Sequence, residues 1–287
     1  MAADMSADPA TAPSDSAPAR GRRQPLEQHK RLGAVNWIGL WTLYAKEVRR
    51  FLNVYTQTIV APVITTLLFY AVFALALGGQ IKQAGGVSFM TFLAPGLIIM
   101  GMVQNAFANT SSTLVISKVQ GNIVDVLMPP LSALELTLGY VGGGVTRGLV
   151  VGLAVGIGIA LFADVSVQSW GLVIYHAFMG SMMLSLLGVL GGIWSEKFDH
   201  IAAVTNFIIT PMTFLSGTFY TIDRLPESWQ TVALFNPFFY MIDGFRHGFI
   251  GHSDISVWTG MIVMAGVNAA LFGLAWNLFS RGYKLKP

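Results

Sequence analysis

Five side chains able to bind protons or metal ions lie close together near the end of the sequence. They are Asp243, Arg246, His247, His252 and Asp254, within the segment "NPFFYMIDGFRHGFIGHSD" at 236–254. Carboxylates and imidazoles are zinc ligands, and residues four apart on a helix can share one ion. His252 and Asp254 follow Gly251, however, a residue type that commonly ends helices. Their spacing fixes no common geometry, so we predict no metal or catalytic site and keep a membrane-embedded enzyme as an alternative.

The same segment has the features of a short helix. Asn236 is a good N-cap, Pro237 suits the first helical position, and Gly251 suits the end. The residues between them would span about 21 Å, too short for an upright membrane span. An apolar face is formed by Phe238, Met241, Ile242, Phe245 and Phe249. We therefore predict a helix that enters the outer leaflet and turns back, with Asp243, Arg246 and His247 as gate or packing residues.

Spacing also predicts how those charges pair, and a neighbouring proline suggests a companion helix. Asp243 can form an ion pair with Arg246 at i+3 or with His247 at i+4. Pro226 can open a second short helix just before the first, which would give a re-entrant pair.

Composition identifies the class of protein that must position these residues. The 287 residues are 54% hydrophobic and 11% charged, and the mean hydropathy is +0.61. Such values indicate an all-α membrane protein with many spans. Cysteine is absent, so no disulfide, thiolate metal site or thiol nucleophile is available. The net charge of +3 comes from Lys and Arg beside apolar segments, which argues for membrane orientation and against nucleic acid as a partner.

Six segments are long and apolar enough to cross a bilayer. They lie near 56–78, 89–110, 136–162, 170–194, 201–221 and 256–280. Thirteen Lys and Arg residues fall on the side of the termini and three on the other side. The positive-inside rule therefore predicts that both termini are cytoplasmic.

The chain divides into three regions. Residues 1–35 are rich in Ala, Ser, Pro and Asp, which predicts a disordered cytosolic tail. Residues 36–55 carry aromatic residues on one helical face and charges on the other, as in a helix that lies in the membrane interface. Residues 56–287 then form the transmembrane domain.

Span 3 contains a row of small residues and one charge. Gly144, Gly148, Gly152 and Gly156 recur every four residues, a spacing that lets another helix, from this chain or a second copy, approach closely. Arg147 lies within the same span, where it can snorkel to water or reach a carboxylate, or serve function. It is the one clear charge that we identify within the spans, so a proton relay of Asp, Glu or His is missing.

Prolines 62, 95 and 211 predict kinks or breaks in spans 1, 2 and 5. Broken helices either line a transport path or are simply tolerated, and the sequence leaves both readings open.

The loop after span 2, "SSTLVISKVQGNIVDVLMPPLSALE" at 111–135, has an apolar and a polar helical face. Lys118, Asn122 and Asp125 share the polar face, and two prolines end the helix. Such a helix either docks on a soluble partner or lies on the membrane.

Two segments resemble the membrane subunits of type-2 ABC transporters, in particular bacterial inner-membrane multidrug and lipid exporters. They are "FLAPGLIIMGMVQNAFANTSSTLVISKVQGNIVDVLMPPLSALELTLGYVGGGVTRG" at 92–148 and "TFLSGTFYTIDRLPESWQTVALFNPFFYMIDGFRHGFIGHSD" at 213–254, and the likeness covers roughly 36–281. The resemblance implies a homodimer with two ATP-binding-cassette ATPase subunits. It also implies that a cytoplasmic coupling helix, here about 112–128, contacts the ATPase through Lys118, Gln120, Asn122 and Asp125.

The sequence contains no G-x-x-x-x-G-K-[ST] phosphate cradle, so ATP and Mg²⁺ would bind the partner and this chain would carry no cofactor. Lipid-like or drug-like substrates suit spans with many aromatic residues and almost no charge. Export of a polysaccharide or lipid-linked glycan is the alternative within the family.

Overall fold

The computed structural model describes residues 35–78 and 83–284. The predicted tail at 1–35 lies almost entirely outside the described residues. The elements before the first hairpin are α1 (Trp37–Asn53), the π-helical segment η1 (Thr56–Val60) and α2 (Ala61–Leu77). A hairpin follows, made of β1 (Gln83–Ala84) and β2 (Val87–Ser88).

Helices make up most of the remainder. They are α3 (Phe89–Val119), α4 (Ile123–Leu127), α5 (Ala133–Ala160), α6 (Trp170–Trp194), α7 (Phe198–Val204), the π-helical η2 (Thr205–Ile209), α8 (Thr210–Leu215), the 3₁₀ turn η3 (Ile222–Arg224), α9 (Glu227–Leu234), α10 (Pro237–Ile250) and α11 (Val257–Arg281). The prediction of a helical membrane protein is confirmed.

Five helical segments of the described chain are long and apolar enough to cross a membrane. They are Thr56–Ala76, Phe89–Val119, Ala133–Ala160, Trp170–Trp194 and Val257–Arg281. The sixth predicted span, 201–221, is instead a helix in three pieces that begins at Phe198 and ends at Leu215. It ends early because Gly217 has a φ of +77°, which a continuing helix excludes. The count of six crossings therefore stays a prediction.

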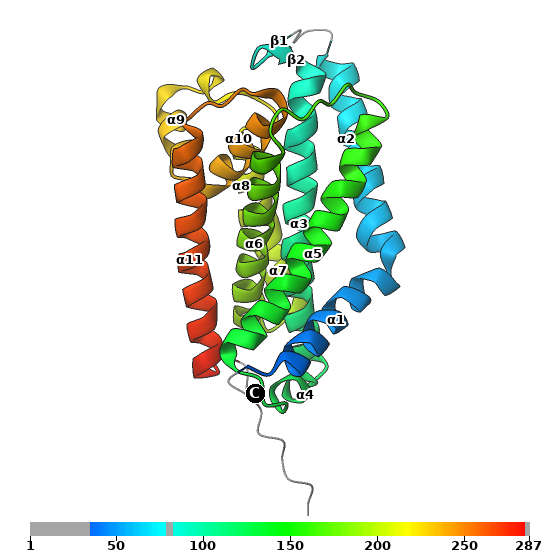
Figure 1. Cartoon of the computed structure of the whole chain (residues 1–287), viewed down its shortest axis with the longest axis vertical. Coiled ribbons are helices and arrows are strands. Elements are labelled where there is room, and N and C mark those ends of the chain that lie inside the picture. Colours follow the sequence, from blue (N-terminus) through cyan, green and yellow to red (C-terminus); the bar gives the residue numbers. More distant parts are fainter. Residues whose placement is uncertain (1–34, 79–82, 285–287) are drawn as a thin grey trace, which may run out of the picture. The chain divides into compact units, whose positions relative to one another are not determined.

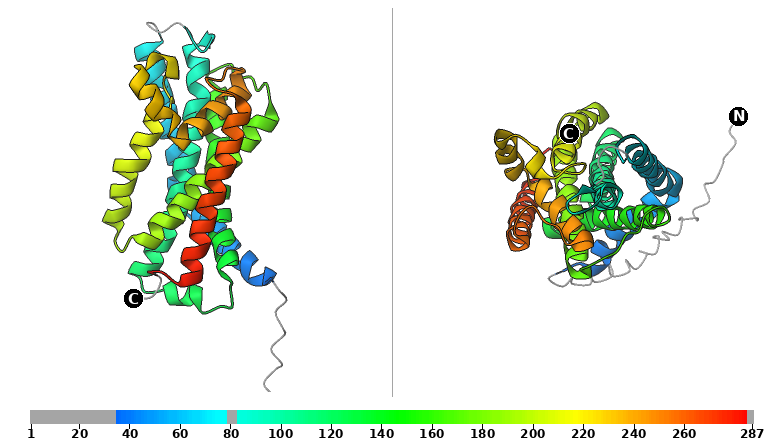
Figure 2. Two further views of the ribbon diagram at one scale, coloured as in Figure 1. Left: turned by 90° about the vertical axis from the view of Figure 1, so that its left-hand side faces the viewer. Right: turned by 90° about the horizontal axis from the view of Figure 1, so that it is seen from above.

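Helix α3 is the centre of the packing. It packs along α6 and α5, and α10 packs against α6, α11 and α3. Figure 1 shows α9, α10 and the hairpin at one end of the long helices, and α1 and α4 at the other. We call these the α10 end and the α4 end. Figure 2 shows the same helices from the side and from above, with α11 running alongside α6.

Of the three prolines predicted to interrupt spans, Pro62, Pro95 and Pro211, the first and the last follow a π-helical segment. η1 ends at Val60 and Pro62 lies in the first turn of α2, while η2 ends at Ile209 and Pro211 opens α8. A wide π turn changes the hydrogen-bond register where proline lacks an N–H group. The predicted interruptions of spans 1 and 5 thus take this form, whereas Pro95 lies inside the continuous helix α3.

The hairpin was not part of the sequence prediction. Gln83 pairs with Ser88 and Ala84 with Val87, and the turn residues Gly85 and Gly86 have φ of +57° and +79°. Two successive positive φ values are typical of tight hairpin turns built from glycine. A side-chain carbon on Gly85 would lie 2.9 Å from His252, so the hairpin covers the loop after α10.

Candidate functional site

At the α10 end, the capping residues indicated by the sequence bound α10. The Asn236 side chain accepts a hydrogen bond from the Phe238 N–H at 3.1 Å, and Gly251 ends the helix with a φ of +70°. Asn236 Nδ2 also donates to Met212 O at 3.0 Å and to Ser216 Oγ at 2.8 Å. The start of α10 is therefore fixed to the end of α8. A separate helix, α9, precedes it, as Pro226 suggests.

Arg246 is the largest fully buried side chain, and only 1% of its surface is exposed. Its Nη2 donates to Gly217 O at 2.5 Å and lies 3.4 Å from Thr218 O, while the guanidinium carbon is 3.9 Å from the centre of the Phe92 ring. A cation in this position is stabilised by the ring face and by carbonyl dipoles. Arg246 thus joins α10 to α3 and to the turn after α8.

The predicted pairing of Asp243 with Arg246 or His247 is wrong. Asp243 Oδ2 accepts from Ser253 Oγ at 2.7 Å, and Oδ1 accepts from the Asp254 N–H at 2.9 Å. Helical spacing brings residues near each other, but the loop after Gly251 folds back and offers better-placed donors. Burial raises the pKa of Asp243, while these two hydrogen bonds act in the opposite direction.

The other groups of the predicted cluster take part in loop contacts. Asp254 Oδ2 accepts from the Ile222 N–H at 3.2 Å, and its Oδ1 lies 3.1 Å from His252 Nε2. His247 Nδ1 is buried and has no hydrogen-bond partner among the described residues. Within 35–78 and 83–284, no group of three or more His, Asp or Glu side chains is arranged to hold a metal ion.

His176, which the sequence analysis missed, lies beneath α10. It belongs to α6, is fully buried, and its Nδ1 is 3.0 Å from Leu172 O. A side-chain carbon on Gly244 would lie 2.1 Å from the His176 Nε2 atom. Close packing of an imidazole edge against a glycine is visible only in three dimensions. The sequence signal available was a histidine inside an apolar span.

At the α4 end, the single helix predicted for about 112–128 has the wrong bounds. α3 continues to Val119 because Ser111, Thr113, Leu114, Val115 and Ser117 are buried. Gly121, with a φ of +73°, then breaks the chain, and α4 covers only Ile123–Leu127. Gln120, Asn122 and Asp125 are exposed, together with the apolar side chains of Val119, Val124 and Met128.

Lys118 lies in a different environment from the other three predicted contact residues. Its Nζ donates to Ile193 O and, at 3.2 Å, to Ser195 O, where α6 ends. Carbonyls in the last turn of a helix lack helical partners and carry the negative end of the dipole, so a lysine there is stabilising. We therefore regard Lys118 as a residue that links α3 to α6.

The N-terminal helix α1 is held by a buried carboxylate. Glu47 has no exposed surface; its Oε2 accepts from Thr113 Oγ1 at 2.7 Å and lies 3.2 Å from Arg50 Nη2. Arg50 Nη2 also donates to Asn109 O at 2.8 Å. The pattern of residues 36–55 predicts that their charged residues share the face opposite the aromatic one, and for Glu47 a place on an exposed charged face is wrong. The space left by Gly143 admits it, since a side-chain carbon there would lie 2.5 Å from Glu47 Cβ.

The glycine row of α5 faces α3 and α6 of the same chain. Side-chain carbons would lie 2.4 Å from Ser185 Oγ at Gly144, 2.9 Å from Ser181 Oγ at Gly148 and 2.8 Å from Met102 Sδ at Gly152. At Gly156 the nearest atom would be 3.8 Å away. Arg147 lies between Gly144 and Gly148 in the sequence, and it donates to Asn105 Oδ1 of α3 at 2.9 Å. Its partner is therefore an amide, whereas a carboxylate was one of the partners expected from the sequence.

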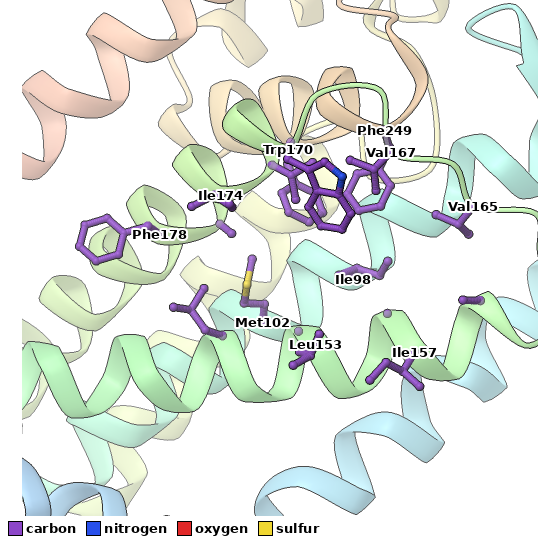
Figure 3. A pocket seen from close by; sticks show the side chains of 17 residues that line it. Ile98, Met102, Leu153, Ile157, Val165, Val167, Trp170, Ile174, Phe178 and Phe249 are labelled. Carbon is purple, nitrogen blue, oxygen red and sulfur yellow. The ribbon is translucent and has the colours of Figure 1, made fainter.

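An apolar cavity of about 530 Å³ lies between α3, α5, α6 and α10. Figure 3 shows Ile98 and Met102 of α3, Leu153 and Ile157 of α5, and Trp170, Ile174 and Phe178 of α6 around it. Many of these side chains are also exposed on the outside of the chain, as expected for surfaces in contact with lipid.

A chain of aromatic rings joins α2 to α8. Ring centres are 6.4 Å apart for Phe69 and Phe73, 4.6 Å for Phe73 and Phe219, and 5.2 Å for Phe214 and Phe219. Nearby, α7 buries no residue and Phe207 of η2 is 81% exposed. Asn206 is exposed beside Phe207. An amide facing hydrocarbon is costly, so this face of the chain is better suited to a polar path or another protein surface.

The fold and these two ends define a multi-pass transport protein, and the chain belongs to the ABC-2 type transporter family, whose model matches residues 39–250. It is 39% identical over 250 residues to the inner membrane transport permease YadH of Escherichia coli (strain K12), covering 87% of this chain and 98% of that protein. It is 23% identical over 229 residues to nodulation protein J of Rhizobium leguminosarum bv. trifolii, covering 78% and 85% of the two chains. Nodulation protein J of Neorhizobium galegae is 24% identical over 242 residues, with 81% and 88% covered.

Proposed function

We propose that this chain is the permease subunit of an ATP-driven exporter in the bacterial inner membrane, with both termini cytoplasmic. The observation that carries the proposal is the exposed, partly apolar tip formed by 119–128, which lies directly on the end of the long helix α3. An ATP-binding-cassette ATPase subunit would bind this tip, and ATP and Mg²⁺ would bind to the ATPase subunit. No phosphate cradle occurs in the sequence printed here.

The contact with the ATPase is best tested at Asp125. Asp125→Lys reverses an exposed charge at the tip and should greatly reduce co-purification of the ATPase subunit. Glu227→Lys is the matched control, because it reverses an exposed acidic residue at the α10 end. Equal amounts of ATPase subunit recovered with both variants would contradict the proposed contact.

Two copies would form the transport path, with the side of α2 that carries Phe69 and Phe73, together with α7–α8, turned towards the partner copy. This arrangement gives Asn206 a polar environment and covers Phe207. The chain has no cysteine, so an introduced one is unique. Phe207→Cys should form a disulfide-linked dimer in membranes, whereas Ile262→Cys on the exposed face of α11 should not. Cross-linking at position 262 alone would reject this face.

The proposed cargo is an amphipathic or hydrophobic molecule, drug-like or lipid-like. The aromatic chain from Phe69 to Phe214 supplies apolar surface and no charge, which suits such a molecule. Rings also stack on sugars, so a lipid-linked glycan is the second candidate. Counterflow in liposomes with a fluorescent amphipath and with a glycan-bearing lipid distinguishes the two. Loss of amphipath transport in Phe73→Ala with normal dimer formation would support the first.

The enzyme alternative depends on the histidines at the α10 end. His247→Ala with His252→Ala should leave transport largely unchanged, because Asp243 keeps its contacts with Ser253 and Asp254. Complete loss of activity together with loss of a bound metal would instead favour a catalytic site.

A further inference from the structure

We propose that the basic side of α1 is a binding site for the headgroup of an anionic phospholipid. The site is a hollow of about 530 Å³ lined by Lys46, Arg49 and Arg50, with Trp41 and Thr42 beside them. All of these residues belong to α1, so lipid binding can be measured on the purified permease.

The exposed surface of α1 has two unlike halves. One half is apolar: Trp37 is 71% exposed, Ile38 80% and Trp41 67%. The other half carries Thr42, Lys46, Arg49 and Asn53, spaced four, three and four residues apart and therefore along one side of the helix. The face opposite both is buried against the protein through Leu43, Glu47 and Phe51. A helix with adjacent apolar and basic exposed halves suits the boundary between acyl chains and headgroups.

The position of the basic side agrees with that boundary. α1 ends at Asn53, and after a turn at Val54 the chain continues into the apolar segment Thr56–Ala76. Figure 1 shows α1 crossing the α4 end at an angle, with α2 rising from its C-terminal end. Arg49 and Arg50 therefore lie just before the residues that enter the membrane, at the depth where phosphate groups lie.

Apolar continuity favours lipid over a protein partner. Exposed apolar side chains follow α1 along the chain: Tyr55 just before η1, Val60 of η1, and Ile64 and Leu68 of α2, which are 41% to 62% exposed. Acyl chains that cover these side chains would place their own headgroups towards α1, beside Lys46 and Arg49. Among the described residues neither of these cations has an ion-pair partner, so each is available to a phosphate.

Arg50 gives the site a connection to the interior. Its side chain is 29% exposed, and its Nη2 is engaged with Glu47 and Asn109, while its Nη1 lies 3.4 Å from Ser112 Oγ. A phosphate that binds the exposed edge of this guanidinium would share it with α3. Anionic lipid would then hold α1 against α3 more firmly, as a ligand that binds only the packed state does.

Native mass spectrometry of the purified permease tests the site. Short-chain phosphatidylglycerol and phosphatidylcholine with the same acyl chains are titrated in parallel. We expect a preference for phosphatidylglycerol that falls about 30-fold in the double variant Lys46→Gln/Arg49→Gln. The control is Arg281→Gln/Lys284→Gln, which removes two charges at the α4 end, from the last residue of α11 and from the turn after it, and it should keep the preference.

Three results would overturn the proposal. The first is an unchanged preference in Lys46→Gln/Arg49→Gln, and the second is an equal decrease in the control, which would indicate unspecific charge attraction. The third is a Lys46→Gln/Arg49→Gln variant that no longer co-purifies with the ATPase subunit but keeps its lipid preference, which would make this side of α1 a protein interface. A melting temperature measured in phosphatidylcholine shows whether the double variant folds. Lys46→Arg/Arg49→Lys changes the same two side chains but keeps both charges. This variant should therefore keep the lipid preference, which separates the effect of charge from an effect on folding.

Discussion

The guanidinium of Arg246 lies against the face of the Phe92 ring, 3.9 Å from its centre, although the two residues belong to α10 and α3. The same guanidinium donates to Gly217 O after α8. One buried cation therefore holds together three segments that are separate in sequence.

Replacing Arg246 with Met should lower the free energy of unfolding by about 3 kcal/mol, because a charged hydrogen bond and a cation–π contact are both lost. Phe92→Leu should cost about half as much, since it removes the ring and leaves the hydrogen bond. Melting temperatures in detergent micelles measure both. If the effects of the two single variants are additive in the double variant, the two side chains do not interact as the structure indicates.

The glycine row of α5 predicts a difference between two chemically identical changes. Gly144→Ala should destabilise the protein by about 1–3 kcal/mol, because the new methyl group would lie 2.4 Å from Ser185 Oγ. Gly156→Ala should be neutral or slightly stabilising, since its nearest neighbour is 3.8 Å away and alanine favours helix. Thermal unfolding compares them directly, and equal losses would argue against this packing.

Lys118 should behave as a packing residue and Asp125 as a contact residue. Lys118→Met keeps the side-chain stem but removes the donor to Ile193 O and Ser195 O, and should cost about 1–2 kcal/mol of stability. Co-purification of the ATPase subunit should stay near normal, in contrast to Asp125→Lys. A Lys118→Met protein of normal melting temperature that has lost the ATPase subunit would show that we have assigned Lys118 to the wrong role.

Glu47 and Arg50 should be energetically coupled. Glu47→Ala removes the acceptor of Thr113 Oγ1 and leaves Arg50 partly buried without its carboxylate, so we expect a loss of about 3 kcal/mol. In the double variant Glu47→Ala/Arg50→Ala the loss should be clearly smaller than the sum of the two single effects. Chemical denaturation of the reconstituted permease provides these values, and strict additivity would contradict the coupling.

Several elements could be predicted from sequence because one local signal determines each of them. The caps of α10 are an example: Asn236, Pro237 and Gly251 act through their own backbone and side-chain chemistry. Five of the six predicted spans likewise correspond to long apolar helices, because runs of apolar residues predict them directly. In contrast, the partner of Asp243 depends on how the loop at 252–254 folds back, and no local spacing contains that information.

The burial of Glu47 could not be predicted for the same reason. Periodicity groups it with Lys46 and Arg49, but the inward direction of α1 is set by Gly143 of α5, far away in sequence. The predicted bounds of this helix are wrong because Lys118, Gln120, Asn122 and Asp125 indicate a cytoplasmic loop, and local pattern does not show that the polar residues before them, such as Ser111 and Thr113, are buried in α3. In the fold they face neighbouring helices, where their hydroxyl groups bond to backbone carbonyls of the preceding turn.

The length of α3 has a mechanical consequence. Its 31 residues measure about 46 Å at 1.5 Å each, which exceeds the roughly 30 Å hydrocarbon core. From Gly96 to Val119 the sequence contains no proline, and Lys118 fastens its far end to α6. A push on the end of α3 at Val119 would therefore be transmitted stiffly as far as Gly96. Pro95 lies between that stretch and Phe92, so it is the point at which α3 could bend before the load reaches Arg246 of α10.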